Sequence, residues 1–289
     1  MNWKRYERAK DLNEALALLA QAGGKGRVIA GGTDLVLQLH QKEKQTDLLV
    51  DVTPIEELHR LCEEDGHIRI GAAVTHSAAA ESPLLRREAA ALAAGCGMVG
   101  SPQIRNIATL MGNVITAQPA ADAAVPLTAL EAELRVLSPA GERWVPMEAA
   151  YRGVGESAID ATREVAAEIR FRKLEAGAQT RFFRLARRRA LALPVLNGAV
   201  FLWKDGEARR IHEARIALGP VAAQPFRARQ AEACLISDRI TAALLEETAR
   251  LAAAEATPRT SLIRGSEEYR RAMIRLYLTR TLREMLDIG

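Results

Sequence analysis

The pattern of apolar and polar positions predicts strands and helices that alternate early in the chain. Apolar residues at helical spacing predict a helix over residues 12–22, opened by the capping-box sequence Asp11-Leu12-Asn13-Glu14. Short apolar runs at residues 28–30 and 47–52 predict strands, and residues 35–39 between them carry a helical pattern. These elements predict a small α/β unit over residues 1–54.

Residues 55–174 are predicted to form a second unit, and residues 175–289 a third. In the second, helical patterns cover residues 55–61, 84–94 and 127–131, and strand patterns cover 67–71, 133–138, 142–145 and 165–171. In the third, strand patterns cover residues 179–185, 195–203 and 209–218, with a turn at Asp205-Gly206, and helical patterns cover 227–235, 241–254 and 267–286. Strands followed by helices indicate an α+β domain.

The first predicted strand ends in a glycine pair directly before a helix. Residues 28–39 read V-I-A-G-G-T-D-L-V-L-Q-L. Small residues let a ligand approach the backbone closely, and a helix N-terminus favours negative charge, so this turn fits a diphosphate. The same residues also fit an ordinary turn in which Thr33 or Asp34 caps the helix.

A second stretch, residues 104–122, has a similar character. It reads I-R-N-I-A-T-L-M-G-N-V-I-T-A-Q-P-A-A-D, with Thr109, Asn113 and Asp122 among small and apolar residues. Short hydroxyl, amide and carboxylate groups can bind ribityl hydroxyls and phosphate oxygens, and Gly112 leaves room for such a ligand. Alternatively, these side chains satisfy backbone groups of a long buried loop.

Composition and charge narrow the classes of function. Apolar residues make up 48% and charged residues 26%, which is typical of a soluble globular protein. The net charge of +4 comes from dispersed Lys and Arg, so no nucleic-acid footprint is predicted. Cys62, Cys96 and Cys234 lie far apart, which predicts no metal or iron–sulfur site and suits a reducing compartment. Without a signal-peptide pattern or an 18-residue apolar run, we expect a cytoplasmic chain with no membrane span.

Three motifs together resemble one family. They are A-G-G-T-D-L at residues 30–35, I-R-N-x-A-T-x-x-G-N at 104–113 and P-A-A-D at 119–122. They resemble the FAD-binding medium subunit of the molybdenum hydroxylases, the family of xanthine dehydrogenase and carbon monoxide dehydrogenase. The stretch T-P-R-T-S-L-I-R-G-S-E-E-Y-R-R-A-M, residues 257–273, is similar to the family's closing segment.

The resemblance implies an α+β fold and a noncovalently bound FAD. Two FAD-binding subdomains of the vanillyl-alcohol oxidase (PCMH) type, residues 1–54 and 55–174, would precede a C-terminal α+β domain, residues 175–289. The residues it implies for FAD are Ile29, Ala30, Gly31, Gly32, Thr33, Asp34 and Leu35 at the diphosphate, Thr109, Gly112 and Asn113 at the ribityl chain and far side of the diphosphate, Asp122 at the ribityl region, and Arg184 near the flavin. No catalytic residue and no metal ligand is assigned to this chain.

As a member of this family, the chain would relay electrons within a larger enzyme. A large molybdopterin subunit and a small subunit with [2Fe-2S] clusters would be its partners, in a dimer of heterotrimers, and NAD⁺ or another molecule would accept the electrons. No nucleic-acid partner is expected.

The sequence departs from the family at two places. Met111 stands where the second motif usually has a glycine, and residues 185–198 hold no aromatic that could stack on the flavin, which leaves Phe182 or Phe183 as substitutes. Two other interpretations therefore stay open. In the first, the chain is a structural or assembly subunit whose flavin site has decayed. In the second, it is a free-standing flavin oxidoreductase of the same superfamily.

Overall fold

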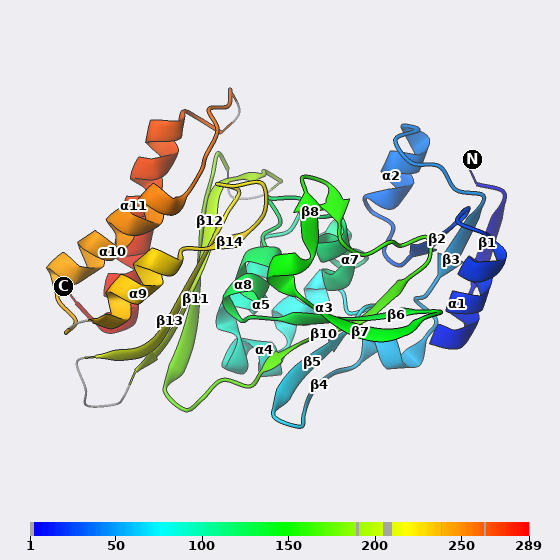
Figure 1. Cartoon of the computed structure of the whole chain (residues 1–289), viewed down its shortest axis with the longest axis horizontal. Helices are drawn as coiled ribbons and strands as arrows, with labels where there is room; N and C mark the ends of the chain where they lie inside the picture. Colours follow the sequence, from blue (N-terminus) through cyan, green and yellow to red (C-terminus); the bar gives the residue numbers. More distant parts are fainter. Residues whose placement is uncertain (1–2, 189–190, 205–209, 238, 263, 289) are drawn as a thin grey trace. The chain divides into compact units, whose positions relative to one another are not determined.

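The chain packs as two compact units built from segments that are not contiguous in sequence. The computed structural model describes residues 3–188, 191–204, 210–237, 239–262 and 264–288 (Figure 1). Unit 1 contains Met1–Ala79, Ser101–Ala117 and Ala132–Arg172, and unit 2 contains Ala80–Gly100, Gln118–Glu131 and Lys173–Gly289. The turn predicted at Asp205-Gly206 and the strand start predicted at Arg209 lie outside the described residues.

The N-terminal part of unit 1 is a three-stranded parallel sheet. Its strand order is β1-β3-β2, with β1 at Arg5–Arg8, β2 at Gly26–Ile29 and β3 at Leu48–Asp51. Helix α1 (Leu12–Gln21) and helix α2 (Leu35–His40) connect successive strands. The side chain of Asp11 accepts the Glu14 N–H at 2.8 Å, which confirms the predicted helix start. Strand β1 was not predicted because Arg5–Arg8 has no apolar run.

The rest of unit 1 is an antiparallel sheet of order β4-β5-β10-β6-β7 with short helices and one small hairpin. Its elements are η1 Glu56–His59, β4 Leu61–Glu64, β5 His67–Gly71, α3 His76–Glu81, α6 Pro102–Arg105, α7 Leu110–Ile115, β6 Glu133–Ser138, β7 Gly141–Pro146, η2 Met147–Ala149, β8 Tyr151–Gly153, β9 Glu156–Ser157 and β10 Val165–Arg172. The helix predicted over residues 55–61 is wrong beyond one 3-10 turn. Leu61 begins a strand there because residues 61–64 pair with β5, a contact that local spacing does not reveal.

Unit 2 is a four-stranded antiparallel sheet of order β11-β12-β13-β14 with helices on both faces. Its elements are α4 Pro83–Glu88, α5 Ala90–Gly97, α8 Ala124–Ala129, β11 Ala178–Ala186, β12 Pro194–Lys204, β13 Ile211–Gly219, β14 Phe226–Arg227, α9 Arg229–Ser237, α10 Ala242–Glu255 and α11 Glu267–Leu286. Leu196, Val200 and Leu202 of β12 pack with α9, α10 and α11, whereas Ala199 packs with α5 and α8 (Figure 1). Both faces of β12 are covered, which explains its nearly continuous apolar sequence.

The single helix predicted over residues 84–94 is two helices. The helix breaks at Ala89, whose φ of −148° and ψ of 56° are not helical.

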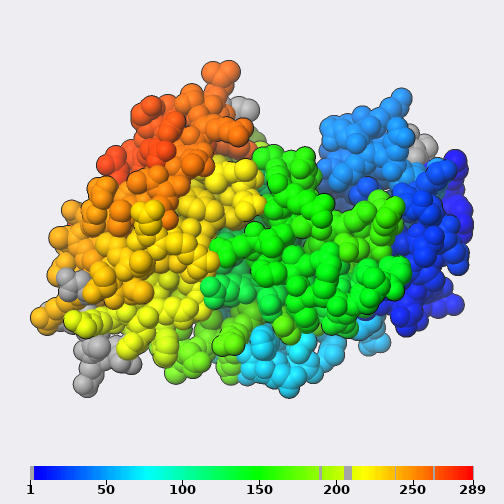
Figure 2. Space-filling view, viewed as in Figure 1, coloured from blue at the N-terminus to red at the C-terminus, as the bar shows by residue number. Residues whose placement is uncertain are grey.

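Figure 2 shows one face of the surface, on which α10 and α11 of unit 2 appear in orange and red. The chain is therefore an α+β protein, as the succession of elements predicts.

Candidate functional site

The first turn, residues 29–35, lies directly against the second loop, residues 104–113, within unit 1. A Cβ atom on Gly31 would lie 2.2 Å from the carbonyl oxygen of Ile107 and 2.9 Å from Cα of Ala108. Only glycine permits backbones to approach this closely. The two glycine-bearing segments are thus brought together by the fold, although 73 residues separate Gly31 from Ile104 in the sequence.

Gly32, the next residue, is constrained by its backbone conformation and not by a close contact with the second loop. Gly32 has a φ of +68°, a conformation that side-chain-bearing residues rarely adopt. Asp34 is exposed and occupies the cap position of α2, but its side chain makes no capping hydrogen bond. The Thr116 hydroxyl donates to the Gly112 carbonyl at 2.8 Å and also lies 3.4 Å from Asp34 Oδ2, so the first turn lies close to the end of α7.

The second loop leads into α7 through a well-formed cap. Thr109 is the cap residue, and its hydroxyl oxygen accepts the N–H of Gly112 at 3.0 Å. A Cβ atom on Gly112 would meet only that hydroxyl, at 2.9 Å, so the remaining space around this position is open. The side-chain oxygen of Asn113 is buried and has no hydrogen-bond partner. A buried acceptor without a donor is costly unless a ligand or water supplies one.

Met111, the departure from the family motif, faces the protein interior. Its side chain is 3% exposed, and it shares the buried side of α7 with Leu110 and Val114. Gly112 and Asn113, by contrast, are only partly buried. The methionine therefore fills core volume in unit 1, and its bulk does not lie on the open side at Gly112.

Asp122 and Arg184 form a buried ion pair in unit 2. Arg184 Nε donates to the two carboxylate oxygens of Asp122 at 3.1 and 3.0 Å, and Asn197 Nδ2 donates to Oδ1 at 2.8 Å. Burial raises the pKa of Asp122, and both Arg184 and Asn197 oppose that rise. The two predicted residues thus contact each other, and the other predicted residues belong to unit 1.

Asn197 was not predicted as part of this group. Its side chain is fully buried, and its Oδ1 has no partner. The sequence did offer one indication of a buried polar group: Asn197 is the single amide among apolar and small residues in the run Val195-Leu196-Asn197-Gly198-Ala199.

The two phenylalanines considered for flavin stacking both pack in unit 2. Phe183 is 8% exposed and lies 6.2 Å from the ring of Tyr277, centroid to centroid. Phe182 packs with Ala91, Val125 and Ala199 on the other face of the sheet. Packing within unit 2 is therefore a sufficient reason for both aromatic side chains, without a flavin.

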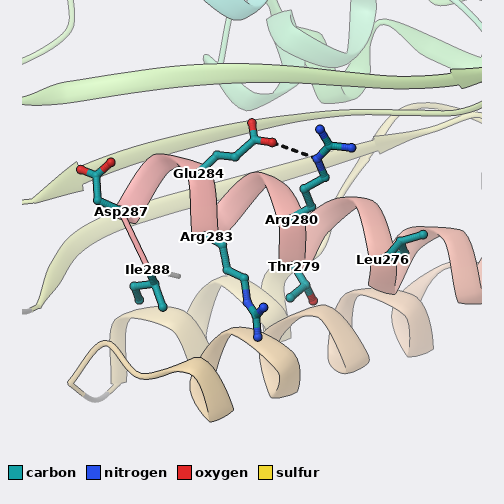
Figure 3. A pocket seen from close by; sticks show the side chains of 7 residues that line it. All are labelled: Leu276, Thr279, Arg280, Arg283, Glu284, Asp287 and Ile288. Atoms are coloured by element: carbon teal, nitrogen blue, oxygen red, sulfur yellow. Dashed lines mark hydrogen bonds and ion pairs between the residues drawn. The ribbon is translucent and has the colours of Figure 1, made fainter.

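A hollow of about 600 Å³ lies along the C-terminal half of α11, and none of the predicted residues lines it. Its lining residues are Leu276, Thr279, Arg280, Arg283, Glu284, Asp287 and Ile288 (Figure 3). Arg280 pairs with Glu284 at 2.9 Å, and Arg283 points to another side of the helix and pairs with Glu246 of α10 at 3.3 Å. Because these charges are paired and lie on an open helix surface, we assign no cofactor to this hollow.

The described residues also bear on metal binding and on membrane insertion. No cluster of three or more His, Cys, Asp or Glu side chains there could hold a metal ion. Nor does any helix in the described part of the chain combine the length and apolar character that crossing a bilayer requires.

Comparisons with known proteins give consistent results over the whole chain. Residues 2–171 match the family model described as the FAD binding domain in molybdopterin dehydrogenase, and residues 181–285 match the CO dehydrogenase flavoprotein C-terminal domain. The chain is 30% identical over 280 residues to a putative xanthine dehydrogenase FAD-binding subunit of Escherichia coli, with 96% of this chain and 94% of the relative covered. It is 31% identical over 243 residues to the nicotinate dehydrogenase FAD-subunit of Eubacterium barkeri, with 83% and 81% covered. Among solved structures, a carbon monoxide dehydrogenase chain of Hydrogenophaga pseudoflava superposes with a TM-score of 0.89 at 29% identity, covering 96% of this chain and 95% of that one.

Proposed function

The chain belongs to the family of FAD-binding subunits of the molybdopterin dehydrogenases, and from this membership we propose that it passes electrons from partner [2Fe-2S] clusters through FAD to NAD⁺ or another acceptor. It is an oxidoreductase component of the molybdenum hydroxylase type. The observation that carries the proposal is the contact between the first turn and the second loop at Gly31.

The residues of unit 1 fit an FAD diphosphate and ribityl chain. Gly112 offers backbone with open space in front of it, and the Asn113 side-chain oxygen, which is buried without a partner in the chain, would accept a hydrogen bond from a ribityl hydroxyl. The N-terminal turn of α2 supplies N–H groups and positive partial charge, whereas the N–H groups of Leu110, Gly112 and Asn113 in α7 are already bonded within the chain. We assign the diphosphate to residues 29–35, and the ribityl chain to Thr109, Gly112 and Asn113.

The chain's own contribution is binding and orientation. The bound flavin supplies the redox chemistry, while the protein sets its position and electrostatic surroundings. The assignment of Asp122 to the ribityl region and of Arg184 to the flavin rests on the family resemblance alone; within unit 2, their mutual ion pair fixes the carboxylate. No side chain is needed as an acid or base for hydride transfer from a flavin.

We propose that a large molybdopterin subunit and a small [2Fe-2S] subunit are the partners. Several relatives are named as medium chains or FAD subunits, such as the carbon monoxide dehydrogenase medium chain of Hydrogenophaga pseudoflava. The described cysteines are free and dispersed, so iron–sulfur clusters in the electron path belong on another chain. A dimer of heterotrimers is the expected assembly.

Replacement of Gly112 tests the site. Gly112→Val should abolish FAD binding, because its side chain would occupy the open space in front of the α7 backbone. The measurement is FAD content after reconstitution, with circular dichroism to verify folding. Gly112 has no positive φ, unlike Gly32, but a Cβ atom there would lie 2.9 Å from the Thr109 hydroxyl, so that hydroxyl must shift in the variant.

Gly97→Val is the matched control. Gly97 also lies in a short helix, and a Cβ atom there would meet only Ala80 Cβ, at 3.8 Å. This variant should keep stoichiometric FAD. If a folded Gly112→Val protein retains FAD as well as Gly97→Val does, the proposed site is wrong.

A further inference from the structure

His76 is fully buried at the start of α3, and the mechanism above does not use it. Neither ring nitrogen, Nδ1 nor Nε2, has a hydrogen-bond partner. A neutral imidazole carries one donor and one acceptor, whereas an imidazolium carries two donors and a charge. The protonated ring would therefore be much more costly than the neutral ring in this environment.

The segment that carries His76 supports the second loop. The main-chain N–H of His76 donates to the Ala108 carbonyl at 3.0 Å, and that of Leu110 donates to the Val74 carbonyl at 3.0 Å. Thr75 lies opposite Thr109 in an antiparallel bridge. These bonds hold the loop in place immediately before Gly112 and Asn113.

A side-chain contact adds to this support. The Ser77 hydroxyl donates to Asn106 Oδ1 at 2.5 Å. Residues 74–77 thus contact the loop at several positions in succession.

Arg105, on α6 within the same loop, is the charged group whose field reaches the imidazole. Burial and, second, Arg105 lower the pKa of His76 from 6.5 to about 4. No carboxylate among the described residues pairs with the ring to offset this repulsion. Protonation would be much less costly if water could reach the ring.

We propose that His76 is a positioning residue for the second loop, and that its neutral form is required for the loop to hold FAD. Protonation opens the loop and withdraws Thr109, Gly112 and Asn113 from the cofactor. This inference rests on the proposed FAD site. It adds a proton-dependent control of cofactor retention.

The test is FAD affinity as a function of pH, measured by flavin fluorescence on the full chain. Wild-type affinity should fall from pH 8 to pH 5, because the ring titrates near 6.5 with the loop open and near 4 with it closed; the upper limit of about 30-fold is reached when the FAD-free loop is mostly open. His76→Leu and His76→Gln should each change less than about threefold over that range, because neither side chain titrates. His59→Gln, which replaces an exposed histidine of unit 1, should keep the wild-type pH dependence.

The outcomes separate this inference from the proposed function. Absence of FAD binding by the wild type at pH 8 would overturn the proposed function itself. Binding at pH 8 with the same pH dependence in wild type and both His76 variants would overturn the role of His76.

Nitrogen NMR of histidine-labelled wild type provides a second measurement that needs no variant. With FAD bound, the His76 ring should stay neutral down to about pH 5, because its pKa lies well below its ordinary value. Titration near pH 6.5 in the FAD-bound chain would contradict the inference.

Discussion

At the scale of single residues, the site depends on atoms that the protein leaves without partners. Asn113 Oδ1 and both His76 nitrogens are buried and unpaired in unit 1. Most buried polar atoms in proteins are paired, so such exceptions mark places where a ligand or water is expected. In unit 2, by contrast, Asp122 is paired with Arg184 and Asn197, so part of its hydrogen-bonding capacity is used by the protein.

Asn113→Ala separates binding from folding. FAD affinity should fall by about 1–3 kcal/mol, the cost of one buried hydrogen bond. Stability without FAD should stay within about 0.5 kcal/mol of wild type, since the lost oxygen has no protein partner. FAD titration and urea unfolding of the FAD-free chain measure the two quantities. A loss of stability as large as the loss of affinity would indicate a structural role instead.

The sequence singled out the candidate residues of unit 1 by type and order, but not their individual constraints. Gly31 is required by contact with Ile107, and Gly32 by its positive φ, so neither glycine is explained by the ligand alone. Gly112 is the position where open space remains. These distinctions depend on three-dimensional contacts, which residue spacing does not encode. The assignment of residues to FAD atoms stays a prediction.

At the scale of elements, one arginine of α11 connects three segments of unit 2. Arg270 is 3% exposed and donates to the carbonyls of Val195 at 3.3 Å, Arg259 at 3.2 Å and Pro220. These carbonyls belong to the start of β12, the loop before α11 and the residue that follows β13. The arginine lies in the closing motif of the family, and its structural role gives that motif a physical reason.

Arg270→Met should lower the free energy of unfolding by about 3 kcal/mol or more, because three buried carbonyls lose a charged donor. Arg280→Met on the same helix is the control. Its ion pair with Glu284 is exposed, at 75% and 42%, and should contribute less than about 1 kcal/mol. Urea unfolding of both variants measures the difference. Equal effects would contradict the role assigned to Arg270.

The spacing of apolar residues along the chain predicted the helices and strands whose own sequence shows one or both faces to be buried. Helix α1 and strands β5, β10, β11, β12 and β13 are examples, as are the three C-terminal helices. It failed where pairing partners decide the conformation. Polar β1 is a strand because it pairs with β3, and residues 61–64 are a strand because they pair with β5. The break at Ala89 has no proline or glycine to signal it.

At the scale of the whole molecule, distant segments combine in ways that a linear reading does not show. Residues 80–100 and 118–131 pack with the C-terminal sheet, so unit 2 includes α5 and α8. The division of the chain at residues 54 and 174 stays a prediction about domains. The α+β class was predictable, because it follows from the order of elements rather than from their contacts.

The most direct test of the account is the flavin content of the purified full-length chain. The protein is denatured and filtered, and the flavin in the filtrate is identified and quantified by chromatography. Noncovalent binding by the first turn and the second loop predicts FAD in the filtrate, stoichiometric with the chain. A colourless protein that cannot be reconstituted with FAD, or a flavin that stays attached to the denatured polypeptide, would contradict it.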